Sequence, residues 1–136
     1  MSNVEQTLSI IKPDAVERDL QGKIKDEFIA KGFKIIKEKK IHISKNEAEQ
    51  FYKVHETKPF YSDLCSYLSS GPIVVMVLEK EDAVLGNREL MGATNPKDAA
   101  DGTIRKKYGI SIDKNSVHGS DSVENSKIEI DFFFKD

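Results

Sequence analysis

The order of apolar and polar residues divides the chain into segments of distinct kinds. The segments Thr7–Pro13, TLSIIKP, and Pro72–Glu79, PIVVMVLE, are short, rich in β-branched residues and bounded by proline. Runs of this kind predict β-strands. Because Pro72–Glu79 lacks polar residues at alternate positions, we expect it to be a central strand that is buried on both faces.

Two other segments alternate apolar with polar residues. Phe33–Ser44, FKIIKEKKIHIS, carries lysines at its exposed positions, which is typical of a strand at the edge of a sheet. Near the C-terminus, KIEIDFFF places Ile128, Ile130, Phe132 and Phe134 at alternate positions. This period of two predicts a half-buried strand as the last element of the fold.

Apolar residues spaced three or four positions apart predict helices between these strands. In LQGKIKDEFIAKG, Ile24, Phe28 and Ile29 share one helical face, and Gly32 is suited to a C-terminal cap. The tetrapeptide SKNE at residues 44–47 fits a capping box, so a helix is expected to begin there. Further helical segments are expected over residues 61–68, 81–92 and 104–107.

The predicted order of elements is strand, helix, strand, two helices, strand, helix, long loop and strand. Two split β-α-β units in this order predict an α+β fold, a ferredoxin-like sandwich with a four-stranded antiparallel sheet covered by helices. At 136 residues the chain is long enough for one domain with an ordinary core. We therefore expect residues 1–136 to form a single domain.

Charge and cysteine content exclude several classes of protein. The net charge is −2, which provides no general attraction to nucleic acids or to membranes. Cys65 is the only cysteine, so an internal disulfide is impossible and a reducing compartment is expected. The N-terminus lacks the basic region of a signal peptide, and the run PIVVMVL is too short to span a membrane. These features predict a soluble, cytoplasmic protein.

The segment 93–126 shows little regular pattern but contains Arg105, Asn115 and His118. Long loops in compact domains are usually functional or disordered, and these side chains favour function. The sequence has neither a P-loop nor a G-x-G-x-x-G motif, so any phosphate site must use dispersed groups. Each single cation is ordinarily a solvated surface residue. The candidate groups are Lys12, Arg88, Thr94, Arg105 and His118.

The stretch NSVHGSDS leaves three interpretations of His118 open. As a metal ligand, His118 lacks partners at the usual spacings. As part of a catalytic triad, His118 would have to be aligned with Ser120 and Asp121. Residues only two and three positions apart in a loop rarely adopt triad geometry. As a nucleophile that accepts phosphate, it would need an exposed ring nitrogen and a carboxylate at the other nitrogen. Gly119 would allow a ligand to approach, and Glu129 in the last predicted strand is a candidate for that carboxylate.

NSVHGSDS, preceded by GATNPKDAADGTIR and by IIKPDAV near the N-terminus, resembles the nucleoside diphosphate kinase family. The resemblance extends from Thr7 to about Phe134. It implies one kinase domain, residues 1–136, that transfers the γ-phosphate of a nucleoside triphosphate, typically ATP, to a nucleoside diphosphate and so maintains the pools of (deoxy)nucleoside triphosphates. It also implies a ping-pong reaction through phosphohistidine at His118. Mg²⁺ would then be bound by the nucleotide phosphates, with no metal ligand from protein side chains.

The resemblance further assigns roles to individual residues. Asn115 and Lys12 match contacts to the sugar hydroxyls, and His55 matches a further residue on the phosphate side. Ser120 and Glu129 match the pair that supports the histidine. The residues that match those holding the phosphates and positioning the nucleotide are Lys12, Tyr52, Arg88, Thr94 and Arg105.

The base is expected to lie against one aromatic residue and two aliphatic ones. Phe60 matches the aromatic residue on which the base stacks, and Leu64 and Ile112 match the apolar residues around it. Stacking uses a π-face that every base has, and it contributes about 1–3 kcal/mol with little preference among bases. Without the resemblance, ordinary core packing would be the favoured role of Phe60.

The sequence departs from the family pattern at few positions. Lys58 replaces an arginine that many members have, and Tyr61 replaces a common phenylalanine. The chain ends at Asp136 without the C-terminal extension of longer members, a region that contributes to subunit contacts. A homo-oligomer is expected, and the choice between tetramer and hexamer stays open.

Two other functions remain as alternatives. A non-catalytic nucleotide-binding module could have the same fold, but it would not need both His118 and Glu129. A role in nucleic-acid binding finds no support in the net charge, and no such partner is expected. The only basic candidate segment, KIIKEKK at Lys34–Lys40, is better explained as the solvated face of a strand.

Overall fold

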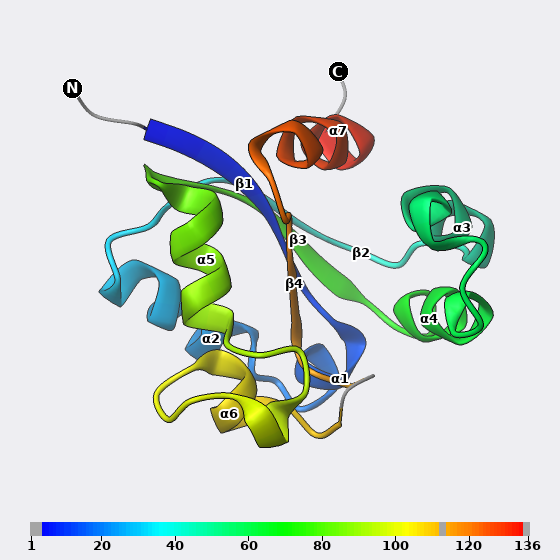
Figure 1. Cartoon of the computed structure of the whole chain (residues 1–136), viewed down its shortest axis with the longest axis horizontal. Helices are drawn as coiled ribbons and strands as arrows, with labels where there is room; N and C mark the ends of the chain where they lie inside the picture. Colours follow the sequence, from blue (N-terminus) through cyan, green and yellow to red (C-terminus); the bar gives the residue numbers. More distant parts are fainter. Residues whose placement is uncertain (1–3, 112–113, 135–136) are drawn as a thin grey trace.

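The structure, a computed structural model, describes residues 4–111 and 114–134. The strands formed by these residues make one four-stranded sheet in the order β2-β3-β1-β4, and every pair of neighbours is antiparallel (Figure 1). This order confirms the predicted ferredoxin-like α+β fold. The strands are β1 (Val4–Ile11), β2 (Lys34–Ile41), β3 (Ile73–Glu81) and β4 (Val117–Gly119).

Helices cover both faces of the sheet, and each face has its own apolar core (Figure 1). Side chains alternate along β1, so Ile11 joins one core while Leu8 and Ile10 join the other. The first core is closed by α1 (Pro13–Glu17), α2 (Gln21–Ala30), α5 (Ala83–Met91) and α6 (Ile104–Tyr108). The second is closed by α3 (Lys45–Phe51), α4 (Tyr61–Leu68) and α7 (Val123–Phe134). Short 3₁₀ helices lie at η1 (Lys53–His55) and η2 (Pro96–Asp98).

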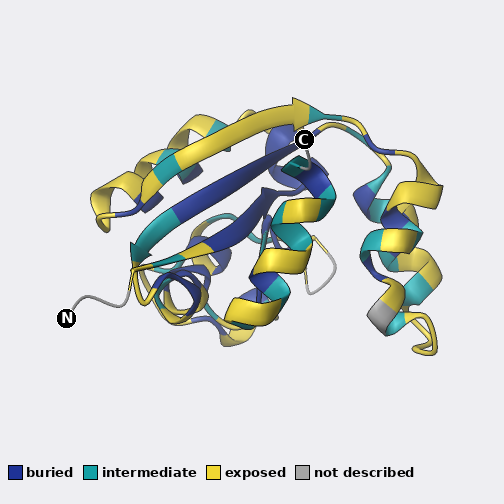
Figure 2. Ribbon diagram, turned by 90° about the horizontal axis from the view of Figure 1, so that it is seen from above, coloured by how far each residue is buried: buried dark blue, intermediate teal, exposed yellow. Residues whose placement is uncertain are grey.

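Burial along the strands confirms the predicted positions of two of them. β3 is central and is buried over most of its length, whereas β2 lies at the edge and is mostly exposed (Figure 2). The lysines of β2 therefore lie on a solvated face, as the alternation indicated. Among the described residues, no helix is long and apolar enough to cross a membrane.

Two predicted helix ends, the start of α3 and the end of α2, are confirmed by their capping residues. Ser44 Oγ accepts the Glu47 N–H at 3.1 Å, and Glu47 Oε1 accepts the Ser44 N–H at 3.0 Å, which completes the capping box of α3. Gly32 follows α2 with φ +88°, a conformation that residues with a Cβ rarely adopt. Helix α1 was not predicted, although Pro13 at its start is suited to the first turn of a helix.

The prediction of a last strand over KIEIDFFF is wrong, because this segment belongs to helix α7. Ser122 Oγ accepts the Asn125 N–H at 3.1 Å and so caps the first turn. Ser126 and Phe133 are buried, while Ile128 is 66% exposed. The buried positions are therefore seven residues apart, as on a helix, and Glu129 lies on a helix rather than a strand.

The fourth strand of the sheet is instead β4, which the sequence placed inside a long loop. β4 pairs with β1 through Ser9 to Gly119, Ile10 to His118 and Ile11 to Val117. The prediction that His118 lies in a loop is therefore wrong. Its position is fixed by backbone hydrogen bonds to a central strand, which suits a residue that must be held in place.

Candidate active site

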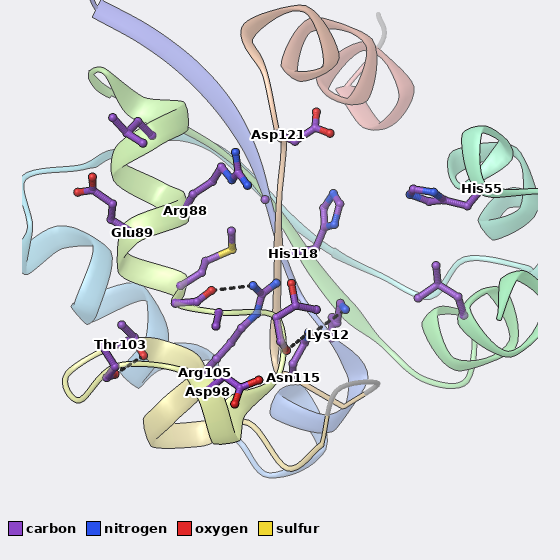
Figure 3. Close-up of a pocket in the computed structure, with 18 of the residues that line it drawn as sticks. Lys12, His55, Arg88, Glu89, Asp98, Thr103, Arg105, Asn115, His118 and Asp121 are labelled. Atoms are coloured by element: carbon purple, nitrogen blue, oxygen red, sulfur yellow. Dashed lines mark hydrogen bonds between the residues drawn. The ribbon is translucent and has the colours of Figure 1, made fainter. Parts of the chain in front are cut away.

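A cleft of about 1210 Å³ opens at His118 (Figure 3). In Figure 3, Arg88 projects from α5 on one side and His55 from η1 on the other, with His118 between them. The residues assigned from the sequence that line it are Lys12, Tyr52, His55, Phe60, Leu64, Arg88, Thr94, Arg105, Asn115 and His118. Ser120 and Glu129 contact each other beside the histidine, and Ile112 lies outside the described residues.

Several residues that line the cleft were not singled out from the sequence. Leu85 and Glu89 lie on the same face of α5 as Arg88, so the helical spacing around Arg88 could have indicated them. Asp98 and Thr103 carry no such signal, since only the path of the chain brings them to the cleft. The full set of additional residues is Leu85, Glu89, Met91, Gly92, Ala93, Asp98, Ala100 and Thr103. Gly119 and Asp121, which the sequence singled out beside His118, also line the cleft.

His118 is oriented by a carboxylate. Its Nε2 lies 3.1 Å from Glu129 Oε1, and Ser120 Oγ donates to the same oxygen at 2.8 Å. Because a carboxylate oxygen accepts, Nε2 carries the proton in the neutral ring. Among the described residues, His118 Nδ1 has no hydrogen-bond partner. The neutral ring therefore offers a lone pair at Nδ1.

Two aromatic rings pack edge-on against the histidine. The ring centroid of His118 lies 5.3 Å from that of Phe51 and 6.2 Å from that of Tyr52. Burial, and then the charge of Glu129, raise the pKa of the Tyr52 hydroxyl well above its usual value. Tyr52 therefore stays protonated and can donate a hydrogen bond at any physiological pH.

Lys12 and Asn115 join distant parts of the chain at the floor of the cleft. Lys12 is 5% exposed, and its Nζ donates to Asn115 Oδ1 at 2.9 Å. Asn115 Nδ2 in turn donates to the backbone oxygen of Thr94 at 3.0 Å. These bonds hold the end of β1, the loop after α5 and the segment before β4 in one arrangement.

The two arginines of the cleft differ in exposure. Arg105 is buried, and it donates to the backbone oxygens of Gly92 at 3.0 Å and Val117 at 2.9 Å. Burial lowers the pKa of Arg105 to about 10, so its guanidinium remains charged at neutral pH. Arg88 is exposed and has no ion-pair partner within the described part of the chain. Both cations are therefore available to compensate negative charge in the cleft.

The exposed aromatic ring of Phe60 lies at the rim of the cleft, near His55. Phe60 is 48% exposed, and its ring centroid lies 6.2 Å from that of His55. Lys58 Nζ lies 5.7 Å from the Phe60 ring centre. Burial, followed by the nearby charges of Lys58 and His118, lowers the pKa of His55. This end of the cleft thus combines a free aromatic face with a histidine that favours its neutral form.

The described residues contain no group of three or more His, Cys, Asp or Glu side chains that could hold a metal ion. The cleft instead brings the cations Lys12, Arg88 and Arg105 together with hydroxyl and amide donors, groups that suit an anionic ligand, although Glu89, Asp98 and Asp121 also line it.

Comparison with known proteins identifies one family. The family model described as nucleoside diphosphate kinase matches residues 5–136. A nucleoside diphosphate kinase of Campylobacter jejuni is 61% identical over 132 residues, which cover 97% of this chain and 96% of the relative. One of Geotalea uraniireducens is 57% identical over 131 residues, 96% of each chain.

Solved structures agree with these sequence matches. The crystal structure of the Aquifex aeolicus nucleoside diphosphate kinase superposes with a TM-score of 0.95 at 44% identity, covering 97% of this chain and 96% of the other. The enzyme of Encephalitozoon cuniculi gives a TM-score of 0.94 at 39% identity, covering 97% and 90% of the two chains.

Proposed function

The chain belongs to the nucleoside diphosphate kinase family, and we propose that His118 carries the phosphoryl group between the two nucleotides. The enzyme transfers the γ-phosphate of a nucleoside triphosphate to a nucleoside diphosphate. One observation carries the proposal for His118. Its Nε2 lies at Glu129 Oε1 and its Nδ1 is unpartnered among the described residues, in a side chain that lines the cleft.

The proposed reaction has two matching steps. The Nδ1 lone pair forms a bond to the γ-phosphorus, while the bond between that phosphorus and the oxygen bridging to the β-phosphate breaks. The departing nucleoside diphosphate keeps the bridging oxygen and its electron pair. Glu129 balances the positive charge that develops on the imidazole of His118. A terminal oxygen of the second nucleoside diphosphate then attacks the phosphorus, and the N–P bond breaks.

The cations of the cleft are proposed to bind the phosphates. Phosphoryl transfer requires mainly alignment and compensation of charge, and Lys12, Arg88 and Arg105 provide both. Tyr52 and Thr94 add hydroxyl donors. Bound Mg²⁺ would supply further charge compensation on the phosphates. Because the described residues offer no cluster of three or more ligands, we propose that the nucleotide oxygens would hold it.

The sugar and the base are proposed to lie on either side of this region. Asn115 and Lys12 are proposed to contact the sugar hydroxyls; both line the cleft, and their side chains meet at 2.9 Å, which supports a shared role. The exposed ring of Phe60 offers a stacking surface, and Leu64 lines the cleft beside it. Stacking explains how one site could accept all the common bases.

The experiment is a labelling assay with γ-labelled ATP and Mg²⁺. We expect the parent protein to acquire a label that is lost in acid and retained in alkali, as a phosphohistidine is, and His118→Ala to acquire none. His42→Ala is the matched control, because His42 is remote from the cleft and contacts the backbone oxygen of Ser69. Retention of both label and transferase activity in His118→Ala would show that the proposed nucleophile is wrong.

We further propose that residues 1–136 form a single domain that acts in the cytoplasm as a homo-oligomer, a tetramer or a hexamer. The match of one family model to residues 5–136 supports the single domain. Light scattering on the purified protein measures the subunit number directly.

A further inference from the structure

Ser116, which immediately precedes β4, has an unusual backbone conformation. Its φ is +74°, and among the described residues other than glycine only Asp19 and Asp82 also have positive φ. The Val117 N–H donates back to the Asn115 oxygen at 2.9 Å, so the chain forms a three-residue turn around Ser116. A turn of this hand is rare and strained for residues with a side chain. Such strain persists only where the surroundings impose the conformation.

The surroundings of Ser116 provide three hydrogen bonds. Its backbone oxygen accepts the Lys12 N–H at 2.8 Å. Its hydroxyl donates to Asp14 Oδ2 at 3.0 Å and accepts from Arg18 Nη2 at 3.2 Å. Ser116 is fully buried, so these bonds do not compete with solvent. The strained turn is therefore fastened to the segment that leaves β1 and enters α1.

Asp14 is the centre of this set of contacts. Its carboxylate, which is almost completely buried, also accepts from Arg18 Nη2 at 2.9 Å and from the hydroxyl of Tyr67 on α4. The Tyr67 oxygen in turn accepts the Asp14 N–H at 2.9 Å. Burial and the hydrogen bond to Asp14 raise the pKa of Tyr67, so Tyr67 remains a donor. Asp14 is thus held from two helices while it holds Ser116.

The turn at Ser116 lies between two groups of the active site. Asn115 precedes it and meets the Lys12 ammonium at 2.9 Å. His118 follows two residues later, in the short strand that the turn begins. A change of φ at Ser116 would therefore move Asn115 and rotate β4 at the same time. Neither Asp14 nor Ser116 is among the described residues that line the cleft, so both act through their neighbours.

We propose that Asp14 and Ser116 are positioning residues, which hold the turn that directs Asn115 and His118 toward the bound nucleotide. This inference rests on the proposed function of His118. The Asp14 carboxylate, fixed by Arg18 and Tyr67, keeps Ser116 in its left-handed conformation.

The test compares Ser116→Ala with Ser116→Gly. Both remove the hydroxyl that binds Asp14, but alanine is strained at a positive φ, whereas glycine adopts that conformation without strain. We expect the single-turnover rate of phosphoenzyme formation at saturating ATP and Mg²⁺ to fall in both variants. The fall should be larger in Ser116→Ala, by roughly 10-fold or more, because the strained turn relaxes without its hydrogen bond to Asp14 and small displacements of a nucleophile slow the reaction strongly. Ser116→Gly should keep more of the parent rate, because glycine adopts the positive φ without strain. Mg²⁺–ADP should also bind more weakly, through the displaced Asn115.

Two further variants, together with thermal unfolding, separate an effect on the position of Asn115 and His118 from an effect on the stability of the fold. Asp82→Gly replaces another residue with positive φ, 54°, at an exposed site before α5, and it should keep the parent rate and affinity. If Ser116 acts through Asp14, the double variant Asp14→Asn/Ser116→Ala should lose no more rate than the more impaired single variant. Thermal unfolding of each variant, followed by circular dichroism, measures the folded fraction at the assay temperature.

The inference is overturned if Ser116→Ala keeps both the parent rate and the parent affinity for Mg²⁺–ADP. It is also overturned if the loss of rate equals the loss of folded protein, or if the effects at Asp14 and Ser116 are additive. A parent protein that forms no phosphoenzyme would instead refute the proposed nucleophile. The calorimetric affinity for Mg²⁺–ADP would then still test whether the turn positions Asn115.

Discussion

At the scale of single residues, one carboxylate oxygen decides which nitrogen of His118 can react. Glu129 Oε1 contacts His118 Nε2 at 3.1 Å and Ser120 Oγ at 2.8 Å. An oxygen that accepts two hydrogen bonds has little freedom to rotate away from the ring. The arrangement therefore fixes both the tautomer and the plane of the imidazole, which is what an attacking Nδ1 requires.

This role predicts the effect of Glu129→Gln. The amide lacks the negative charge that would balance the imidazolium of His118. It also has fewer acceptor lone pairs for the hydrogen bonds that Glu129 receives from Ser120 and His118. We expect kcat to fall by roughly 10-fold or more, because the ring loses its orientation. The KM for the nucleotide should change little, since Glu129 is not among the described residues that line the cleft.

Steady-state kinetics with two nucleotides measures both parameters. Glu124→Gln is the matched control, because Glu124 is an exposed residue in the first turn of the same helix, α7. A Glu129→Gln enzyme with an unchanged kcat, or with a loss confined to KM, would contradict the orienting role.

The sequence identified about half of the residues that line the cleft, and the motifs NSVHGSDS and GATNPKDAADGTIR contain four of the assigned ones, Thr94, Arg105, Asn115 and His118. Composition alone left His118 open among three interpretations. The sequence did not indicate Asp14 or Ser116, since their contact joins positions 102 residues apart. Contacts of this kind depend on the folded path of the chain, so no local pattern encodes them.

At the scale of elements, the sequence predicted the buried strands β1 and β3 and the capped start of α3. It did not predict the last two elements, β4 and α7. The apolar runs of β1 and β3 and the capping box of α3 are strong local signals. KIEIDFFF satisfies both a period of two and a helical spacing, because three phenylalanines in succession fit either pattern. β4 has three residues, which is too short for any periodicity, and its pairing with β1 decides its structure.

The close approach of α5 to β4 sets the width of the cleft beside His118. A Cβ added at Gly119 would lie 2.2 Å from Asn87 Nδ2 and 2.7 Å from Met91 Cε. Both contacts are shorter than packed atoms tolerate, so Gly119→Ala must displace the buried side chains of Asn87 and Met91, which pack α5 against β4. Because α5 carries Arg88 and β4 carries His118, we expect Gly119→Ala to lose transferase activity. It should also destabilise the fold by about 1–3 kcal/mol.

Urea denaturation and transferase assays measure these two effects. Gly22→Ala in α2 is the matched control, since a Cβ there meets nothing within 4 Å. It should leave activity unchanged and raise the stability by up to about 1 kcal/mol, because alanine favours the helix. Parent-like stability and activity in Gly119→Ala would show that the helix and the strand are not in tight contact.

At the scale of the whole molecule, a chain with a net charge of −2 gathers three cations at one cleft, which three carboxylates also line. The fold brings Lys12 from the end of β1, Arg88 from α5 and Arg105 from α6 to one cleft, although they are far apart in sequence. In the proposed function, the affinity for the nucleotide phosphates therefore depends on the arrangement of a few side chains and not on the overall charge.

The central claim is that His118 Nδ1 carries the phosphate between the two nucleotides. The most direct measurement is to isolate the phosphoenzyme, identify the phosphorylated nitrogen by phosphorus NMR, and then add a nucleoside diphosphate such as GDP. The account predicts phosphate on Nδ1 of His118 and its complete transfer to GDP. Phosphate on Nε2, on another residue, or on a phosphoenzyme that GDP does not discharge would contradict the account.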